Sequence, residues 1–375
     1  MAKSFVRRFS KYILVTLTIL VIVVFAIACL SSYVNPQFYF WSGFMSLAMP
    51  YLTIALVLLV LAWLILKPII ALVPLLALLA GYKQVNTCFG WNMSNAFVQE
   101  KKEDNLRVVS WNVQSFNGLT HNKKIKSIIR NDLAESIHNL NPDVVCLQEF
   151  NHFYNKGKEA DNIGLFTVKY PFHFFSKDYQ LHKGKYASGC IIFSKYKIIN
   201  TGRQQFNKGN ESLIWVDILF KKDTIRIYNT HLQSFQFKEA DYNNLEKLKE
   251  QNNSLNASKN ILRKMIPAFK RRGEQALQVE SILQACKYKH IICGDFNDVP
   301  NSFVYHTIRG PRRDAFLEKS LGIGRTFISI APTLRIDYIL TDTAFHIQQF
   351  DLVDEGLSDH IMLVTDVGTC DPKKS

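Results

Sequence analysis

Two uninterrupted runs of apolar residues dominate the N-terminal part of the sequence. Tyr12 to Leu30 and Trp41 to Leu66 contain no charged side chain, and each is long enough to cross a hydrocarbon core of ~30 Å as a helix that rises ~1.5 Å per residue. A shorter third run, from Pro68 to Tyr82, lies between two lysines and contains Pro74. The pattern predicts about three transmembrane helices, at 12–31, 41–66 and 68–85, with a re-entrant segment as the alternative for the third.

A cleaved signal peptide is the competing interpretation of the first run, because Lys3, Arg7, Arg8 and Lys11 precede it. Cleavage would leave the second and third runs unexplained. The positive-inside rule places the N-terminus in the cytoplasm and the loop at 31–40 outside, and three spans would leave the rest of the chain outside. We therefore expect a multi-pass protein of an inner or cytoplasmic membrane, with its large domain facing out of the cytoplasm.

From residue 105 onward the pattern changes to short β-type runs separated by helices and polar loops. A helix is predicted over 125–140, and strands at 106–110, 144–147, 189–193, 213–220, 224–229, 290–293, 336–340 and 361–365. This alternation is typical of a layered α/β domain. The chain thus divides into a membrane anchor at 1–85, a linker at 86–104, a domain at 105–368 and a tail at 369–375.

Short polar motifs stand at the C-terminal ends of predicted strands. They are Trp111-Asn112, Gln148-Glu149, Thr230-His231, the run from Gly294 to Asp298, and Ser358-Asp359-His360. Side chains just beyond strand ends of an α/β fold converge on one crevice, so groups that are distant in sequence can share a site. Each motif alone is weak evidence, because a lone Asn is commonly a turn residue and a lone His a structural one.

Taken in this order, the motifs resemble the endonuclease/exonuclease/phosphatase superfamily, which has the deoxyribonuclease-I-like fold. The resemblance covers residues 105–368 and includes Ser110 to Val113, Leu147 to Glu149, Asn229 to Leu232, Gly294 to Asn297, Arg335 to Tyr338 and Ser358 to His360. It implies a four-layer α/β/β/α sandwich, in which two packed mixed β-sheets are flanked by helices, here preceded by the transmembrane segment of a bacterial-type member. It also implies that 105–368 is a catalytic domain that hydrolyses phosphate esters.

A divalent metal ion is part of what the resemblance implies. Glu149, assisted by Asn112 and Asp359, would hold Mg²⁺ or Mn²⁺, which prefer carboxylate, carbonyl and water ligands. His231 and His360 would contact the phosphate, since an imidazolium can donate to a nonbridging oxygen.

The remaining roles concern proton transfer and substrate orientation. Asp295 would accept a proton from the attacking water and Asn297 would orient the phosphate, because positions i and i+2 of an extended segment share a face. Asp337 would hold the ring of His360, with a structural turn-capping Asp as the alternative. Tyr186 is a further candidate for phosphate contact, with an ordinary surface tyrosine as the alternative.

Charge favours polyanionic partners. Lys and Arg outnumber Asp and Glu by 45 to 31, which gives a formal net charge of +14. The most basic stretch contains Lys259, Arg263, Lys264, Lys270, Arg271 and Arg272; it is either a solvated helix face or a surface that contacts a phosphate backbone or lipid headgroups. The seven cysteines lack C-x-x-C spacing, which favours buried thiols over a zinc site or a disulfide framework.

The leading hypothesis is a membrane-anchored, divalent-metal-dependent phosphoesterase, nuclease-like, that cleaves phosphodiesters or phosphomonoesters. The enzymatic alternative is a phosphodiesterase or phosphatase for lipid headgroups, sphingomyelinase-like or phosphoinositide-directed, because a tethered domain meets headgroups at high effective concentration. A non-catalytic membrane interaction module and a transporter with a regulatory domain are weaker alternatives. The expected partners are a phosphate-ester substrate, nucleic acid or lipid, and the bilayer; no obligate protein partner is inferred.

Overall fold

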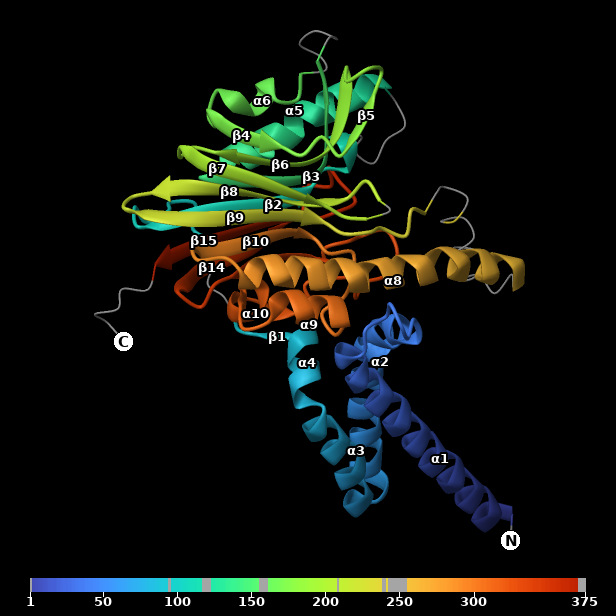
Figure 1. Cartoon of the computed structure of the whole chain (residues 1–375). Helices are drawn as coiled ribbons and strands as arrows, with labels where there is room; N and C mark the ends of the chain where they lie inside the picture. The colour runs from blue at the N-terminus through green and yellow to red at the C-terminus, as the bar shows by residue number, and fades with distance from the viewer. Residues whose placement is uncertain are drawn as a thin grey trace.

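The computed structural model describes residues 2–93, 96–116, 123–154, 161–207, 209–237, 241 and 255–369. Two β-sheets form the centre of the α/β domain (Figure 1). Within the described residues, one sheet has the strand order β14 (Phe345–Val353), β15 (Met362–Thr369), β2 (Asn105–Asn112), β3 (Val144–Phe153), β6 (Tyr186–Ser194) and β4 (Phe172–Phe175), with β5 (Tyr179–Leu181) beside β6. The other has the order β11 (Arg313–Asp314), β13 (Asp337–Thr341), β10 (Lys289–Asp295), β9 (Asp223–His231), β8 (Ser212–Phe220) and β7 (Ile198–Gln205).

The main core lies between the sheets, where Val108 and Cys146 of one sheet belong to the same buried cluster as Ile227 and Ile291 of the other. Helices cover the two outer faces: α5 (Lys123–Asn139) and α6 (Gly164–Thr167) one sheet, α8 (Leu255–Gln284) and α9 (Phe303–Arg309) the other. A short helix, α10 (Ala315–Lys319), packs beside β13 and β14. The layers therefore follow the predicted α/β/β/α order, and the predicted fold class is confirmed.

Most predicted elements are present with extended boundaries. The predicted hairpin is β8 paired with β9, and the polar stretch before residue 289 is helix α8. The strands β7 and β14, which the pattern did not predict, stand at the edges of the two sheets. Six of the cysteines are described and all six are free thiols; Cys370 lies outside the described residues.

The N-terminal segment consists of α1 (Ala2–Leu30), a short turn η1 (Ser31–Tyr33), α2 (Trp41–Leu66), α3 (Pro68–Ala80) and α4 (Tyr82–Cys88). Among the described helices, α1 and α2 are each long and apolar enough to cross a membrane. The third predicted helix, 68–85, is instead a pair of helices bent by 69°, which makes up to three spans if the pair counts as one. The break lies at Gly81, between α3 and α4.

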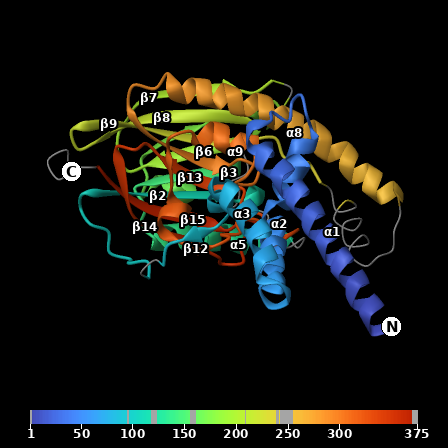
Figure 2. The same ribbon diagram turned by 90° about the horizontal axis from the view of Figure 1, so that it is seen from below.

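Helices α1 and α2 meet the α/β domain at the end that carries η1, and α4 returns to the same side (Figures 1 and 2). Asn301 Nδ2 donates to the carbonyl of Ala28, 2.8 Å away. Arg335 Nη2 donates to the carbonyl of Thr87, also at 2.8 Å. The anchor is therefore hydrogen-bonded to the domain near the end of α1 and again near the end of α4.

The segment 86–104, which the sequence predicts as a linker, contributes to this contact. It contains the end of α4 and a short strand, β1 (Gly90–Trp91), which pairs with β12 (Leu321–Gly322) of the α/β domain. Residues 94 and 95 of this segment lie outside the described residues.

Candidate active site

Three polar side chains lie in one row across neighbouring strands. In the register of β9, β10 and β13, Asp295 pairs with His231 on one side and with Asp337 on the other. Asn112, at the end of β2 in the other sheet, reaches this row, and its Nδ2 donates to Oδ2 of Asp295 at 3.0 Å. The site therefore lies where the ends of the two sheets meet, as the strand-end motifs predict.

Two of the five motifs that the sequence places at C-terminal strand ends stand elsewhere: Gln148-Glu149 lies inside β3, and Ser358-Asp359-His360 precedes β15. Asp337 is the first residue of β13, and His360 stands two residues before β15. Both strands run antiparallel to a neighbour, β13 to β10 and β15 to β2. Their beginnings therefore lie at the same edge as the C-terminal ends of β2 and β10.

A bulge in β3 directs Glu149 into the site. Between Leu147 and Phe150 the pairing with β6 is shifted by one residue, and Glu149 has a left-handed φ of 50°. Leu147 and Phe150 both belong to the buried cluster beneath α5, although residues i and i+3 of a regular strand point to opposite faces. The extra residue allows both apolar side chains to remain buried while Glu149 turns toward Asn112, whose Nδ2 lies 3.3 Å from Oε1.

The segment after β10 is a turn. A Cβ at Gly294 would lie 2.0 Å from the carbonyl oxygen of Thr230 on β9, so this close approach requires glycine. Asn297 has a φ of 53°, and its N–H donates to Oδ1 of Asp295 at 2.8 Å. The predicted extended geometry from Asp295 to Asn297 is therefore wrong, but the turn still places both side chains on one cavity.

The carboxylate of Asp295 is the centre of the polar contacts. It accepts from Asn112 and Asn297, and the Nε2 atoms of His231 and His360 lie 3.6 and 3.7 Å from Oδ2. Burial, and then the nearby Asp337, raise the pKa of Asp295 to about 6.

The imidazole of His360 is buried against two carboxylates. Its Nδ1 lies 2.9 Å from Oδ2 of Asp337. Burial lowers the pKa of His360, but the charges of Asp337 and Asp295 outweigh burial and raise it to about 10. The ring is therefore a cation at neutral pH, with Nε2 available as a donor.

Two further carboxylates, of Glu149 and Asp359, line the same cavity as Asp295 and are oxygen donors suited to a hard divalent cation. Asp359 accepts from Gln114 Nε2 at 3.2 Å. Burial raises the pKa of Asp359, His360 lowers it in part, and the charge of Glu149 raises it again. Two carboxylates with an adverse mutual interaction, beside the amide of Asn112, fit a Mg²⁺ or Mn²⁺ ion, which would relieve that repulsion.

A second group of residues forms a different candidate metal site. Ligand atoms of Asp295, Asp337 and His360 all lie within 4.8 Å of one another. Asp337 and His360 already bond to each other, and Asp295 accepts two hydrogen bonds. This group includes an imidazole, whereas Glu149, Asp359 and Asn112, each of which accepts one hydrogen bond, offer only oxygen ligands to a hard cation.

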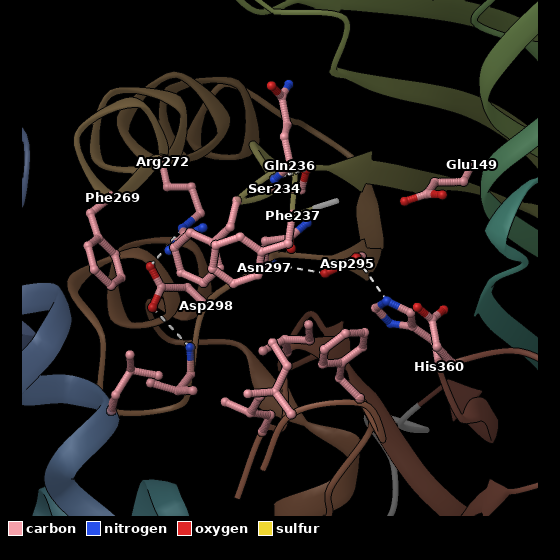
Figure 3. Close-up of a pocket in the computed structure, with 18 of the residues that line it drawn as sticks. Glu149, Ser234, Gln236, Phe237, Phe269, Arg272, Asp295, Asn297, Asp298 and His360 are labelled. Atoms are coloured by element: carbon pink, nitrogen blue, oxygen red, sulfur yellow. Dashed lines mark hydrogen bonds and ion pairs between the residues drawn. The ribbon is translucent and has the colours of Figure 1, made fainter. Parts of the chain in front are cut away.

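The structure brings together all but one of the residues proposed from the sequence. Glu149, Asp295, Asn297, Asp359 and His360 line one cavity of about 270 Å³ (Figure 3), and the other three contact them, namely Asn112, His231 and Asp337. Tyr186 lies apart: it is not among the residues that line this cavity, and its ring packs on Phe153 at 4.7 Å. Its contact with phosphate stays a prediction.

Three supporting residues have no role assigned from the sequence, although Trp111 and Ser358 belong to its motifs. Gln114 bonds to Asp359, Ser358 Oγ donates to the carbonyl of Asn112 at 2.8 Å, and Trp111 Nε1 donates to the carbonyl of His360 at 2.7 Å. Two of them adjoin predicted site residues, and Gln114 lies two positions after Asn112. Their position within or beside the motifs is the feature of the sequence that could have identified these three residues.

The basic stretch on α8 is neither uniformly solvated nor uniformly available for phosphate. Arg272 is fully buried, and its Nε lies 3.1 Å from Oδ2 of Asp298. Lys264 is paired with Asp241, whereas Lys259 and Lys270 are exposed. For Arg272 a solvated helix face is therefore wrong, because it is buried and pairs inside the domain.

Two family models match the chain. That of the "Endonuclease/Exonuclease/phosphatase family" matches residues 109–360, more than half of the chain. That of a "Domain of unknown function (DUF8431)" matches residues 11–88, the segment of the apolar helices.

Individual proteins are more distant. A DNA-(apurinic or apyrimidinic site) endonuclease of Dictyostelium discoideum is 27% identical over 131 residues, 35% of this chain and 31% of that protein, so the match spans about a third of this curated relative. The crystal structure of an endonuclease/exonuclease/phosphatase from Beutenbergia cavernae aligns with a TM-score of 0.51 and 17% identity, over 71% of this chain and 72% of that one. The human Nocturnin catalytic domain with bound sulfate aligns with a TM-score of 0.49 and 20% identity, over 72% and 94%.

Proposed function

Because the chain belongs to the endonuclease/exonuclease/phosphatase family, whose members are metal-dependent hydrolases of phosphate esters, we propose that it is a membrane-anchored phosphodiesterase that uses Mg²⁺ or Mn²⁺. The observation that carries the proposal is that Glu149, Asp295 and His360 line one cavity while Asn112 and His231 contact Asp295 beside it, so that five separate segments of the chain meet at one site. Nucleic acids and lipid headgroups both present phosphodiesters, and a phosphomonoester would meet the same groups.

Glu149, Asn112 and Asp359 would hold the metal ion. When bound, such an ion neutralises charge on the phosphate oxygens and favours the deprotonated form of a water ligand. The hydrogen bonds from Asn112 to Glu149 and from Gln114 to Asp359 would orient the two carboxylates toward it.

Asp295 would receive the proton of the attacking water. Its carboxylate is held by Asn112 and by the N–H of Asn297, so its direction is set before substrate arrives. His360 and His231 would donate from Nε2 to phosphate oxygens as charge builds up in the transition state. Among the described side chains, Nε2 of His231 has no hydrogen-bond partner although it is buried, which supports a role toward a ligand.

The anchor would hold this site on the outer face of the membrane. The loop after α1 and the end of α4 both contact the α/β domain, so the domain lies on the side of the membrane opposite the N-terminus if α1 spans it. The positive charges before residue 12 favour a cytoplasmic N-terminus.

The test uses the full-length protein in detergent micelles and bis(p-nitrophenyl) phosphate as substrate. We expect turnover with Mg²⁺ or Mn²⁺ and none with EDTA. His231→Ala, which removes a donor to the phosphate, and Asp295→Asn, which removes the proton acceptor, should each reduce turnover by about 100-fold or more. His346→Ala and Asp354→Asn change exposed residues and serve as controls. Unaltered turnover in both site variants would contradict the assigned roles, and no turnover under any condition would favour a non-catalytic module.

A further inference from the structure

The cavity that contains the site has two chemically different ends. Glu149, Asp295, Asp359 and His360 lie at one end. Leu47, Phe269, Phe327, Ile330 and Leu334 are the main apolar residues of the remaining lining, which also includes Arg272 and Asp298; the ring of Phe327 lies 4.9 Å from that of His360 and joins the two ends. In Figure 3, Glu149 and Phe269 stand at opposite sides of the cavity, with Asp295 and Asn297 between them.

The apolar end is built where the α/β domain meets helix α2. Leu47 of α2 packs against the buried cluster formed by Val299, Phe327 and Ile336. Phe269 of α8 lies 5.0 Å from the ring of Phe44 on α2. A membrane helix therefore supplies part of the wall of the active-site cavity.

If α2 spans a membrane, the contact lies at the level of the membrane surface. About 20 helical residues cover a hydrocarbon core of ~30 Å, and counting back that number from the end of α2 at Leu66 reaches Leu47. Lys67 follows at the far end, and the aromatic residues Phe40 and Trp41 precede the span at the near end, as is usual at an interface. The apolar end of the cavity thus adjoins the outer boundary of the hydrocarbon region.

A buried donor lies beside the apolar wall. The guanidinium of Arg272 stacks on Phe235 and Phe269, 4.5 and 4.9 Å from their ring centroids. One of its nitrogens bonds to Asp298, while Nη2 has no hydrogen-bond partner among the described groups. Since an unpaired buried donor costs free energy, Nη2 is suited to an uncharged oxygen of a ligand that lies between the phosphate and an apolar chain.

We propose that the substrate is a membrane lipid carrying a phosphodiester, with its phosphate at Asp295 and its hydrocarbon chain along Leu47 and Phe327 toward the bilayer. This inference rests on the proposed function and specifies its substrate class. The water oxygen forms a bond to phosphorus, the bond from phosphorus to one ester oxygen breaks, and the departing alkoxide takes up a proton, which gives an alcohol and a phosphomonoester. The cavity of about 270 Å³ is near the lower limit of ligand clefts, so it would hold the headgroup and the first part of one chain.

A nucleic acid fits this cavity less well. Backbone binding needs several free cationic groups, whereas the cavity lining has four carboxylates, at Glu149, Asp295, Asp298 and Asp359, and its arginine is paired with one of them. An apolar wall offers nothing to a second phosphate of a polymer.

The test measures how kcat/KM depends on chain length. Full-length protein in detergent micelles with Mn²⁺ is given p-nitrophenyl alkyl phosphates with methyl, butyl and octyl groups, and plasmid DNA in parallel. We expect kcat/KM to rise by about tenfold or more from methyl to octyl, since each buried methylene favours binding. Equal kcat/KM across the series, or DNA cleavage faster than octyl ester cleavage, would overturn the lipid assignment but leave the phosphodiesterase. Failure to hydrolyse any ester would overturn both.

A pair of variants distinguishes binding of the alkyl chain by the cavity wall from partition of the substrate into the micelles. Leu47→Trp fills the apolar end and should reduce the octyl-to-methyl ratio to near one. Leu61→Trp makes the same change on α2 at an exposed position that does not line the cavity, and should keep the wild-type ratio. Equal ratios in both variants would contradict the proposed path of the chain. If Leu47→Trp does not fold, the chain-length series with the wild-type protein still tests the lipid assignment.

Discussion

The ring of His360 is held by one carboxylate and faces another. Its Nδ1 lies 2.9 Å from Oδ2 of Asp337, while its Nε2 lies 3.7 Å from Oδ2 of Asp295. Asp337 therefore fixes the orientation of the ring and favours the proton on Nδ1, and Nε2 remains directed into the site.

Asp337→Asn should lower kcat by about 10- to 100-fold with little change in KM, the usual cost of losing a carboxylate that orients a functional histidine. Asp337→Glu should recover part of the lost kcat. Steady-state kinetics with a chromogenic phosphodiester measure both parameters, with Asp354→Asn as the matched control. A loss in Asp337→Asn that appears only in melting temperature, with kcat preserved, would leave Asp337 a purely structural role.

Mn²⁺ should raise the melting temperature of the full-length protein without substrate. An ion at one hundred times its Kd stabilises the folded state by about 2.7 kcal/mol, which corresponds to a rise of a few degrees in a domain of this size. In Glu149→Gln this rise should largely disappear, while Glu355→Gln, at an exposed position, should retain it. Equal Mn²⁺ shifts in both variants would show that Glu149 is not a ligand.

His306 should make the junction between domain and anchor sensitive to acid. Burial, aided by Arg309, lowers the pKa of His306 to about 4, and its ring stacks on Tyr33 of η1 at 6.4 Å. The unfolded chain therefore binds a proton near pH 6.5 that the folded chain takes up only near pH 4. Neutral His306 therefore contributes fully to the free energy of unfolding above pH 6.5, and this contribution is lost as the pH falls toward 4.

The measurement compares wild type with His306→Asn, which cannot titrate. Between pH 7 and pH 4 the wild type should lose roughly 3 kcal/mol more free energy of unfolding than the variant, at ~1.4 kcal/mol per pKa unit. Melting temperatures in detergent across this range detect the difference, and His346→Asn, at an exposed histidine, should follow the wild type. Parallel curves for wild type and His306→Asn would contradict the assignment.

A reporter that fluoresces only in the cytoplasm should stay dark when fused to the C-terminus. The reason is the return of α3 and α4 to the side of the loop at 31–40, which gives three crossings if this bent pair spans the membrane together with α1 and α2. A fusion ended after residue 67, beyond α2, should fluoresce and shows that the reporter works. Bright fluorescence from the full-length fusion would place the α/β domain in the cytoplasm.

Much of the fold follows from the apolar runs of the central strands, which bury both faces. The edge strands lack such runs, so the sequence pattern does not predict them. β7 has one neighbour, and five of its eight residues are exposed without alternation. In β14 buried Phe345 and Ile347 alternate with exposed His346 and Gln348, but a shift in register near Gln349 interrupts the alternation. Neither strand therefore has a continuous period of two that the sequence pattern could reveal.

The polar residues of the site could be predicted because they cluster in short motifs at strand ends. Their geometry could not, since the bulge at Glu149 and the turn at Asn297 depend on how β3 and β10 pair with other strands. The contact between Leu47 and Phe327 joins residues that are far apart in the chain. Nothing local in either sequence segment indicates that they meet.

The close attachment of the domain to its anchor has a kinetic consequence. The hydrogen bonds from Asn301 to Ala28 and from Arg335 to Thr87 join the α/β domain directly to α1 and α4. The domain therefore has no long tether that would let it move away from the anchor. If its substrates diffuse within the bilayer, the rate of encounter depends on their number per unit area of membrane. Dilution of the surrounding solution would then leave turnover unchanged, whereas dilution of the substrate with other lipids would reduce it.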